Sequence, residues 1–435
     1  MTRIALESLK AWKEKPDRKP LVIRGARQVG KTWLMKEFGR AEYGKSAYIN
    51  FDSNPRMLNL FKNDLDIERI LTGLRIETGC NIDAHDTLII FDEIQECPAA
   101  LSSLKYFCES APEYHIIAAG SLLGVALHAG TSFPVGKIEF LDLYPLDFME
   151  FLLASGKSDL AGLIARREIS LINTFRDTFV ELLKTYYFTG GMPEVLEAFI
   201  SNHNYAKVRE IQKRILETYE LDFSRHAPSG LVPRLRMVWN SIPSQLVKEN
   251  RKFVYGLIRE GARAKEYESA LAWLCDSGLA YRIARVSKPA IPLPAYEDIH
   301  AFKLFMFDIG LLGAMSGLDN RTLLEGNAVF QEFKGALTEQ FVLQQLKTMK
   351  DMRIFYWSAE KSEAEVDFIL QSGGRIVPLE VKAEENLRAK SLKSYRERYS
   401  PTLSIRASMS NYRRDDWLLN IPLYMINILP SCMPE

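Results

Sequence analysis

Gly25-Ala26-Arg27-Gln28-Val29-Gly30-Lys31-Thr32 fits the pattern GxxxxGK[ST], and it lies directly between a strand-like and a helix-like segment. The strand-like segment is Leu21-Val22-Ile23, and the helical pattern runs from Lys31 to Phe38. Glycines allow such a loop to turn its backbone amides inward around a phosphate, through dihedral angles that other residues resist. The helix that follows adds the positive end of its dipole to the same anion site. The stretch therefore predicts a phosphate-binding loop at a strand-to-helix turn.

The loop assigns roles to two side chains. Lys31 is expected to reach the β- and γ-phosphates of ATP, and the Thr32 hydroxyl is expected to ligate Mg²⁺. The backbone of the other six residues would surround the phosphates: Gly25, Ala26, Arg27, Gln28, Val29 and Gly30. Taken alone, the pattern is also compatible with a glycine-containing turn that caps an ordinary helix.

A second motif favours the nucleotide site. Leu88-Ile89-Ile90-Phe91 is an apolar strand pattern that ends in Asp92 and Glu93. In α/β folds, ligands bind at the carboxyl ends of the strands. Asp92 is therefore expected to hold Mg²⁺, and Glu93 to act as the general base that orients and deprotonates the attacking water. The two motifs together predict an ATPase with ATP and Mg²⁺ as its cofactors.

Further strand patterns alternate with helical ones in the N-terminal part, at Ala47 to Phe51, Thr87 to Phe91 and His115 to Ala119. Fully apolar strands separated by helices predict a parallel sheet that is covered on both faces. From about Asp142 to Ser229 only helical patterns occur, which we interpret as a helical lid. The Gly190-Gly191-Met192-Pro193 stretch is expected to be a turn within it.

The next segment, Leu235 to Val286, has the pattern of a winged helix. Glu266 to Cys275 is amphipathic, and Gly278 to Ile283 resembles a wing strand; Pro289, Pro292 and Pro294 would mark the far edge. The apolar face of that helix comprises Tyr267, Ala270, Leu271 and Leu274. A final α/β segment begins near Phe330. Its expected strands are Ile354 to Trp357, Glu365 to Leu370, Ile376 to Val381 and Thr402 to Arg406.

Several motifs together resemble one family over nearly the whole chain. They are Val135-Gly136-Lys137, Tyr144 to Phe151, Gly190 to Glu194, Ile242 to Leu246, Phe333 to Glu339 and Pro378 to Lys382. The chain resembles the bacterial and archaeal AAA-type ATPases of the AAA_14/DUF4143 architecture. The resemblance implies an AAA-like P-loop domain (1–150), a helical lid (151–232), a winged-helix-like domain (233–328) and a restriction-endonuclease-like domain (329–435).

The resemblance also bears on residues near the γ-phosphate. Ser121 follows the strand that ends at Ala119, and in AAA-like ATPases a polar residue there senses the γ-phosphate or the water. Ser121 is equally compatible with a helix N-cap. Spacing alone does not locate an arginine finger: Lys137, Arg225 and Arg234 are candidates, and each is also compatible with an ordinary surface charge. The family commonly has Arg where this chain has Lys137, which weakens that candidate.

The C-terminal segment contains an Asp…Glu-x-Lys pattern. Alternation along strands predicts that Glu380 and Lys382 share one face, with Asp367 beside them on the neighbouring strand. In a restriction-endonuclease-like fold, the two carboxylates hold Mg²⁺ and the lysine stabilises the attacking hydroxide. Glu339, on the preceding helical pattern, resembles an additional metal-site acid. Three readings stay open: a nuclease, a nucleic-acid-binding fold that does not cut, and a charged surface hairpin.

A basic stretch follows, from Asn386 to Arg414. Its cations are Arg388, Lys390, Lys393, Arg396, Arg398, Arg406, Arg413 and Arg414, and its interleaved aromatics are Tyr395, Tyr399 and Tyr412. This composition is typical of a surface that follows a phosphate backbone with aromatic stacking partners. A solvated helix face has the same composition.

The bulk composition limits the remaining choices. The 435 residues carry a net charge of only +1, so any nucleic-acid or membrane surface must be local. The five cysteines form no CxxC pair, which disfavours a cysteine zinc site. We expect a cytoplasmic protein without membrane spans. DNA is the expected partner, and a homo-oligomer stays open. The rival function is an ATP-gated signalling switch whose C-terminal domain is a non-catalytic docking module.

Overall fold

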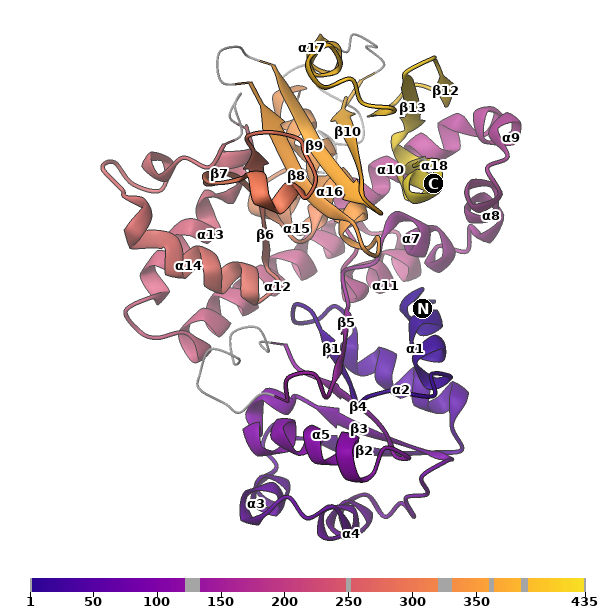
Figure 1. The fold of residues 1–435 in the computed structure, drawn as a ribbon, viewed down its shortest axis with the longest axis vertical. Helices are drawn as coiled ribbons and strands as arrows, with labels where there is room; N and C mark the ends of the chain where they lie inside the picture. Colours follow the sequence, from indigo (N-terminus) through magenta and orange to yellow (C-terminus); the bar gives the residue numbers. More distant parts are fainter. Residues whose placement is uncertain are drawn as a thin grey trace. The chain divides into compact units, whose positions relative to one another are not determined.

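The computed structural model describes residues 2–121, 134–247, 252–319, 331–359, 364–384 and 390–433 (Figure 1). Two compact units can be distinguished. The first comprises Met1–Tyr144 and Asp276–Leu279, and the second comprises Pro145–Cys275 and Ala280–Glu435. Each unit has its own sheet.

The first unit is built on a parallel sheet with the strand order β2-β3-β4-β1-β5. The strands are β1 (Leu21–Arg24), β2 (Lys45–Asn50), β3 (Thr87–Asp92), β4 (His115–Ala119) and β5 (Glu139–Asp142). The α/β class with a parallel sheet is confirmed. The strand β5 was not predicted, because this edge strand alternates half-buried and exposed residues and lacks an apolar run.

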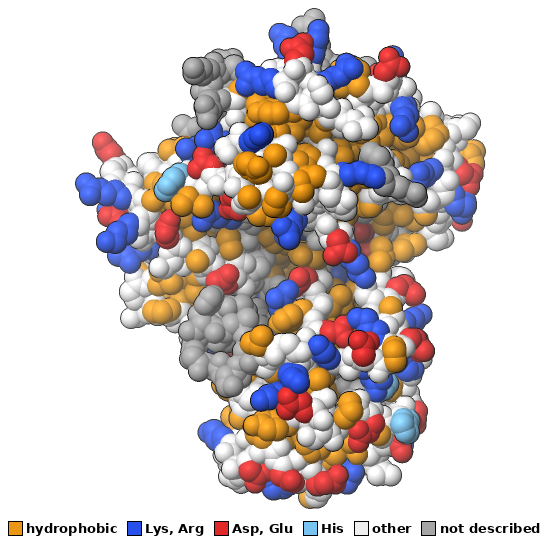
Figure 2. Space-filling view, in the orientation of Figure 1, with side chains coloured by type: hydrophobic (Ala, Val, Ile, Leu, Met, Phe, Trp, Pro, Cys, Tyr) orange, Lys and Arg blue, Asp and Glu red, His pale blue; other side chains and the backbone are white. Residues whose placement is uncertain are grey.

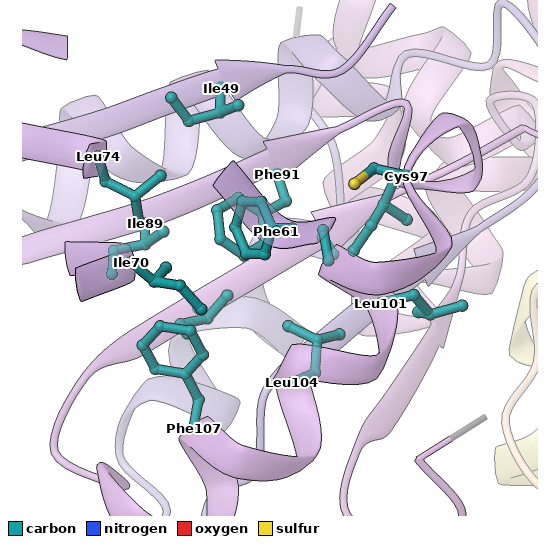
Figure 3. Close-up of a cluster of buried hydrophobic side chains, with 14 of the residues drawn as sticks. Ile49, Phe61, Ile70, Leu74, Ile89, Phe91, Cys97, Leu101, Leu104 and Phe107 are labelled. Atoms are coloured by element: carbon teal, nitrogen blue, oxygen red, sulfur yellow. The ribbon is translucent and has the colours of Figure 1, made fainter. Parts of the chain in front are cut away.

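Helices cover both faces of this sheet. They are α1 (Ala5–Lys13), α2 (Lys31–Glu42), α3 (Pro55–Asn63), α4 (Ile67–Thr78) and α5 (Pro98–Ser110), with a short 3₁₀ helix, η1 (Ile94–Glu96). Figure 3 shows side chains of α3, α4 and α5, among them Phe61, Leu74 and Phe107, packed with Ile89 and Phe91 of β3. These five side chains are at most 1% exposed. This packing fixes the carboxyl end of β3, where Asp92 and Glu93 lie.

The second unit begins with helices only, as the sequence predicts for this region. They are α7 (Phe148–Ala154), α8 (Ser158–Arg166), α9 (Ile169–Thr174), α10 (Arg176–Thr189), α11 (Pro193–Asn202) and α12 (Tyr205–His226). The expected turn at Gly190 to Pro193 separates α10 from α11. Gly190 has a φ of +69°, and a Cβ there would lie 2.2 Å from Asp308 Oδ1. Glycine is therefore required at this position.

The rest of the second unit contributes an eight-stranded sheet with the order β12-β13-β11-β10-β9-β8-β6-β7. Its strands are β6 (Ala280–Val286), β7 (Glu297–Met306), β8 (Arg353–Ser358), β9 (Glu365–Ser372), β10 (Arg375–Val381), β11 (Ser404–Ser408), β12 (Arg413–Arg414) and β13 (Leu418–Pro422). The accompanying helices are α13 (Val232–Val247), η2 (Tyr255–Leu257), α14 (Ala264–Asp276), η3 (Leu293–Tyr296), α15 (Ile309–Met315), α16 (Gln331–Lys347), α17 (Lys390–Tyr399), η6 (Leu423–Ile428) and α18 (Leu429–Cys432).

The helix and hairpin expected of a winged helix are present as elements. The predicted apolar face of α14 is buried, and β6 pairs antiparallel with β7. The hairpin continues beyond the prolines, however, so Pro289, Pro292 and Pro294 lie between its two strands and not at a far edge. Arg285 of β6 also pairs with Tyr356 of β8. The hairpin and the C-terminal segment therefore share one sheet.

A buried polar cluster joins the parts of the second unit. Asp308 Oδ2 accepts hydrogen bonds from the Gly191 amide over 2.7 Å and from Gln344 Nε2 over 3.1 Å. Gln344 also donates to Tyr186 Oη over 3.0 Å, and Tyr186 is fully buried on α10. Burial raises the pKa of Asp308 above its usual value. Since buried polar groups are costly when left unpaired, these contacts favour one arrangement of α10, α15 and α16.

Within the described ranges, no helix is sufficiently long and apolar to cross a bilayer.

Candidate functional site

The predicted phosphate loop connects β1 to α2 in a strained backbone conformation. Gly30 is the N-cap of α2 with a φ of 95°, and Gln28 has a φ of 64°. Gly25 has a φ of +151°, and a Cβ there would lie 2.2 Å from the carbonyl oxygen of Leu143. The conformation that the glycines were expected to provide is therefore present. Arg3, which sequence reasoning missed, donates to the Val29 carbonyl over 3.0 Å, and no local motif marks it.

Lys31 lies inside the loop and is 7% exposed. Its Nζ donates to the carbonyl oxygens of Gly25 over 2.9 Å and Ala26 over 2.7 Å. Burial lowers the pKa of Lys31 to about 8, although the Glu93 and Asp92 carboxylates favour the charged form. A phosphate bound within the loop would supply a full negative charge to this desolvated ammonium group, in place of the carbonyl dipoles.

The first turn of α2 contacts the end of β3. Thr32 Oγ1 donates to Asp92 Oδ2 over 2.7 Å, and Tyr48 of β2 donates to the same oxygen over 2.9 Å. Asp92 is 3% exposed. A hydroxyl and a carboxylate are the hard oxygen ligands that Mg²⁺ prefers. The two residues that the sequence predicts as metal ligands are thus adjacent, and their donor atoms fit this ion.

Glu93 and Ser121 also lie together. Ser121 Oγ donates to Glu93 Oε2 over 3.3 Å, and it accepts from Arg27 Nε over 3.3 Å. Gln95 Nε2 donates to the same Glu93 oxygen over 2.6 Å. Sequence reasoning missed Gln95, although its position two residues after the carboxylate pair was a signal. These contacts link the phosphate loop, the end of β4 and the carboxylate expected to act as the base.

The three candidates for an arginine finger lie on different elements. Lys137 Nζ forms an ion pair with Glu109 Oε1 over 2.9 Å, with both side chains more than a third exposed. Arg225 lies in α12 and Arg234 in α13, both in the second unit. The assignment of an arginine finger stays a hypothesis.

The C-terminal pattern is brought together on β9 and β10. Glu380 is 2% exposed, and its Oε1 pairs with Lys382 Nζ over 2.8 Å. Asp367 Oδ2 accepts from the Val381 amide over 2.7 Å. The other Glu380 oxygen, Oε2, is buried and has no hydrogen-bond partner among the residues that the structure describes. The pKa of Glu380 is raised above its usual value. Burial is the main cause and the Asp367 charge adds to it, whereas the charge and hydrogen bond of Lys382 oppose the shift. A bound cation would compensate for this buried oxygen.

Glu339 has an ion-pair partner, Lys303, that the sequence did not suggest. Lys303 of β7 is completely buried, and its Nζ lies 3.6 Å from Glu339 Oε2 and 2.5 Å from Glu365 Oε1. Across the described ranges, no group of three or more His, Cys, Asp or Glu side chains has the geometry of a metal site. The expected position of Glu339 beside Asp367 and Glu380 therefore finds no support as a three-acid cluster.

Only some side chains of the basic stretch from Asn386 to Arg414 lie at the surface. Arg388 lies outside the described residues. Tyr395 is 1% exposed and packs against Trp357 with 5.3 Å between ring centroids, so this tyrosine belongs to the core. Arg406 is 3% exposed and donates to Asn420 Oδ1 over 2.8 Å. Exposed cations remain on α17, and Figure 2 shows Lys and Arg side chains at the surface of this part of the molecule. The exposed cations of α17 are Lys390, Lys393, Arg396 and Arg398.

Other motifs that carry the resemblance have structural contacts. Asp147 and Glu150 form a capping box at the start of α7. Gln245 binds both the amide and the carbonyl of Val254, over 2.8 and 3.0 Å. Gly191 binds Asp308 as described above. These motifs therefore have structural roles in the second unit.

Comparison with known proteins gives matches to three families. Residues 17–152 match the family described as "AAA domain", residues 180–322 match the domain of unknown function DUF8612, and residues 334–425 match the domain of unknown function DUF4143. Uncharacterized proteins of Mycobacterium tuberculosis and Mycobacterium bovis are each 24% identical over 370 residues, which is 84% of this chain and 70% of each relative.

Solved structures with similarity to the chain include the Walker-type ATPase of Pyrococcus abyssi. It has 15% identity and a TM-score of 0.43, and the alignment covers 72% of this chain and 94% of that chain. The ORC1 protein of Aeropyrum pernix in complex with DNA has 12% identity and a TM-score of 0.27, covering 72% and 90%. The AAA-domain match spans the phosphate loop, Asp92 and Glu93, so this part of the chain is similar to that domain family.

Proposed function

We propose that the chain binds ATP with Mg²⁺ in the loop from Gly25 to Thr32 and hydrolyses it with Glu93 as the general base. The observation that carries this proposal is the contact of Thr32 Oγ1 with Asp92 Oδ2, because it unites the two motifs at one point. Mg²⁺, when bound, neutralises phosphate charge. Lys31 would bind the phosphates, and Glu93 would take the proton of the attacking water.

Two substitutions test these roles. Lys31→Ala should abolish or severely weaken ATP binding, because it removes the cation that contacts the phosphates. Glu93→Gln should retain binding and reduce turnover by about 10²- to 10⁴-fold, because it keeps the shape and removes the base. Isothermal titration and phosphate release measure both effects. Glu96→Gln, at the end of the 3₁₀ helix η1 that follows Glu93, is the matched control and should turn over normally. Unchanged turnover in Glu93→Gln would reject Glu93 as the base.

We further propose that nucleotide binding and hydrolysis are coupled to an action on DNA by the second unit. Support comes from the adjacent Asp367, Glu380 and Lys382 and from the buried Oε2 of Glu380, for which the described part of the chain supplies no hydrogen-bond partner. In the nuclease form of this proposal, Asp367 and Glu380 would hold Mg²⁺ and Lys382 would stabilise the attacking hydroxide. A winged-helix role for α14 and the β6–β7 hairpin belongs to the same proposal.

The nuclease form is tested with Mg²⁺ or Mn²⁺, ATP, and single- and double-stranded DNA and RNA supplied together. Asp367→Ala and Glu380→Ala should abolish cleavage while ATP turnover remains intact, and Lys382→Ala should keep metal binding and lose rate. If no substrate is cut, or if Asp367→Ala cuts as fast as the unaltered protein, the domain is a binding module.

One observation favours the second candidate, an ATP-gated switch with a non-catalytic docking module. Glu339 is paired with Lys303 and does not complete a three-acid site within the described residues. Binding to labelled DNA across a salt series, with and without ATP, separates the candidates. A docking module for protein would show no ATP-dependent DNA binding.

A further inference from the structure

The carboxylate of Glu93 is held from one side by a short helical turn. Glu93 has a left-handed backbone, with a φ of 50°, and it is the N-cap of the 3₁₀ helix η1. A non-glycine residue in this region is uncommon, and such strain is found at functional sites. The tight turn of η1 brings the side chain of Gln95 back toward the carboxylate two residues earlier. Gln95 Nε2 and Glu93 Oε2 are 2.6 Å apart.

Within the described ranges, two side chains donate hydrogen bonds to the Glu93 carboxylate, and both bonds fall on the same oxygen. Oε2 accepts from Gln95 over 2.6 Å and from Ser121 over 3.3 Å. The Gln95 contact is the shorter one, and Ser121 also accepts from Arg27. Two donors on one oxygen fix the plane of the carboxylate. Oε1 is then the oxygen that is left to accept a proton.

The other end of the Gln95 amide supports the same assignment. Gln95 Oε1 is buried, and none of the described residues forms a hydrogen bond with it. Burying an unpaired amide oxygen costs about 1–3 kcal/mol, so a glutamine is an unfavourable choice for packing alone. The amide group is oriented by its NH₂ end, toward Glu93. When only one end of a buried amide is hydrogen-bonded, and that end contacts a reacting group, a functional constraint is indicated.

We propose that Gln95 is a positioning residue for hydrolysis, which anchors Glu93 Oε2 so that Oε1 faces the attacking water. The inference rests on the proposed role of Glu93 as the base. Gln95 itself contacts neither nucleotide nor water in this scheme. Its loss would leave Glu93 present but less well oriented. Misplacement of a reacting group by about 1 Å costs on the order of a hundredfold in rate.

The experiment compares Gln95→Met with the unaltered protein in steady-state ATP hydrolysis. Methionine has a similar length and lacks the donor. We expect kcat to fall about ten- to a hundredfold while KM for ATP and the affinity measured by isothermal titration stay unchanged, because the phosphate loop is untouched. Glu96→Gln is again the control and should keep the original kcat. Retained ATP binding shows that the variant is folded.

A double-mutant cycle separates positioning from a purely structural role. If Gln95 acts through Glu93, the Gln95→Met substitution should cause no further loss in a Glu93→Gln background. Loss of the same factor in both backgrounds, or an unchanged kcat in Gln95→Met, would overturn the inference. Normal turnover in Glu93→Gln alone would instead reject the proposed base, so the two failures are distinguishable.

Discussion

The hydroxyl of Thr32 donates to Asp92 Oδ2 over 2.7 Å, which joins the first turn of α2 to the carboxyl end of β3. The two residues are 60 positions apart in the chain, and β4 lies between β3, which ends at Asp92, and β1, which precedes α2. The strand order is thus what brings these two oxygens together. Their proximity leads to a prediction about how metal and nucleotide affinities are linked.

Thr32→Val should weaken ATP binding about ten- to a hundredfold in the presence of Mg²⁺, because a hydrogen bond to a charged group contributes about 1.5–3 kcal/mol and the same hydroxyl is an expected metal ligand. Thr32→Ser keeps the hydroxyl and should bind almost normally. Isothermal titration with Mg²⁺ and with EDTA measures the effect. An equal loss under both conditions would argue against a metal-ligand role for Thr32.

Lys303 makes the second unit sensitive to the loss of one buried charge. Lys303→Met should lower the free energy of unfolding by about 3–5 kcal/mol, because it removes a buried cation that pairs with the buried Glu339 carboxylate and with the partly exposed Glu365 carboxylate. Urea unfolding measures this change. Adding Glu339→Gln and Glu365→Gln to the same chain should restore much of the stability. If the triple variant is no more stable than Lys303→Met, the charges are not the cause.

His115 should make the first unit sensitive to acid. Burial lowers its pKa to about 4, with further lowering by the charges of Arg18 and Lys13. Between pH 6.5 and 4 the unfolded chain therefore binds a proton that the folded chain does not, so stability falls as pH falls through this window. The loss reaches at most about 3.5 kcal/mol, at about 1.4 kcal/mol per pKa unit.

Urea unfolding of the protein from pH 8 to pH 4 tests this pH dependence. His115→Asn should remove that part of the slope, whereas a change at the exposed His300, His300→Asn, should retain it. The same slope in the protein and in His115→Asn would contradict the assignment to His115.

The cations of α17 give a prediction for DNA binding. If they contact phosphates, the triple change of Lys390, Lys393 and Arg396 to Glu should weaken binding and lower the log–log salt slope by about 0.7–0.9 for each lost contact. A matched control reverses Arg56, Lys62 and Lys105, which are exposed on the first unit and change the net charge equally. ATP turnover without DNA should be normal in both. An identical salt slope in the α17 variant would eliminate this surface.

The sequence by itself determined the local elements of the nucleotide site. The glycine spacing, the apolar run before Asp92 and the helical periodicity after Lys31 each depend on neighbours a few residues away. Such short-range signals reveal which residues form a strand, a helix or a left-handed turn. The β9–β10 hairpin was predicted in the same way: Gly373 and Gly374 have φ values of 54° and 81°, as a two-residue turn requires.

Some misses came from patterns that were visible but were not used. Leu392, Tyr395 and Tyr399 recur at helical spacing along α17, which is typical of a buried face, and Tyr395 is indeed in the core. The prediction that Tyr395 is a stacking partner used the composition of the stretch and not this periodicity. The edge strand β5 had no apolar run from which a strand would be predicted.

Only the tertiary structure decided which side chains meet. The pairing of Lys303 with Glu339 and the convergence of Gln95 and Ser121 on Glu93 join distant segments or depend on the angle of one short turn. Periodicity indicates which face of an element a side chain occupies, whereas the strand order and the crossovers determine what lies opposite that face. A charge in the sequence therefore has no assigned partner until the chain has packed around it.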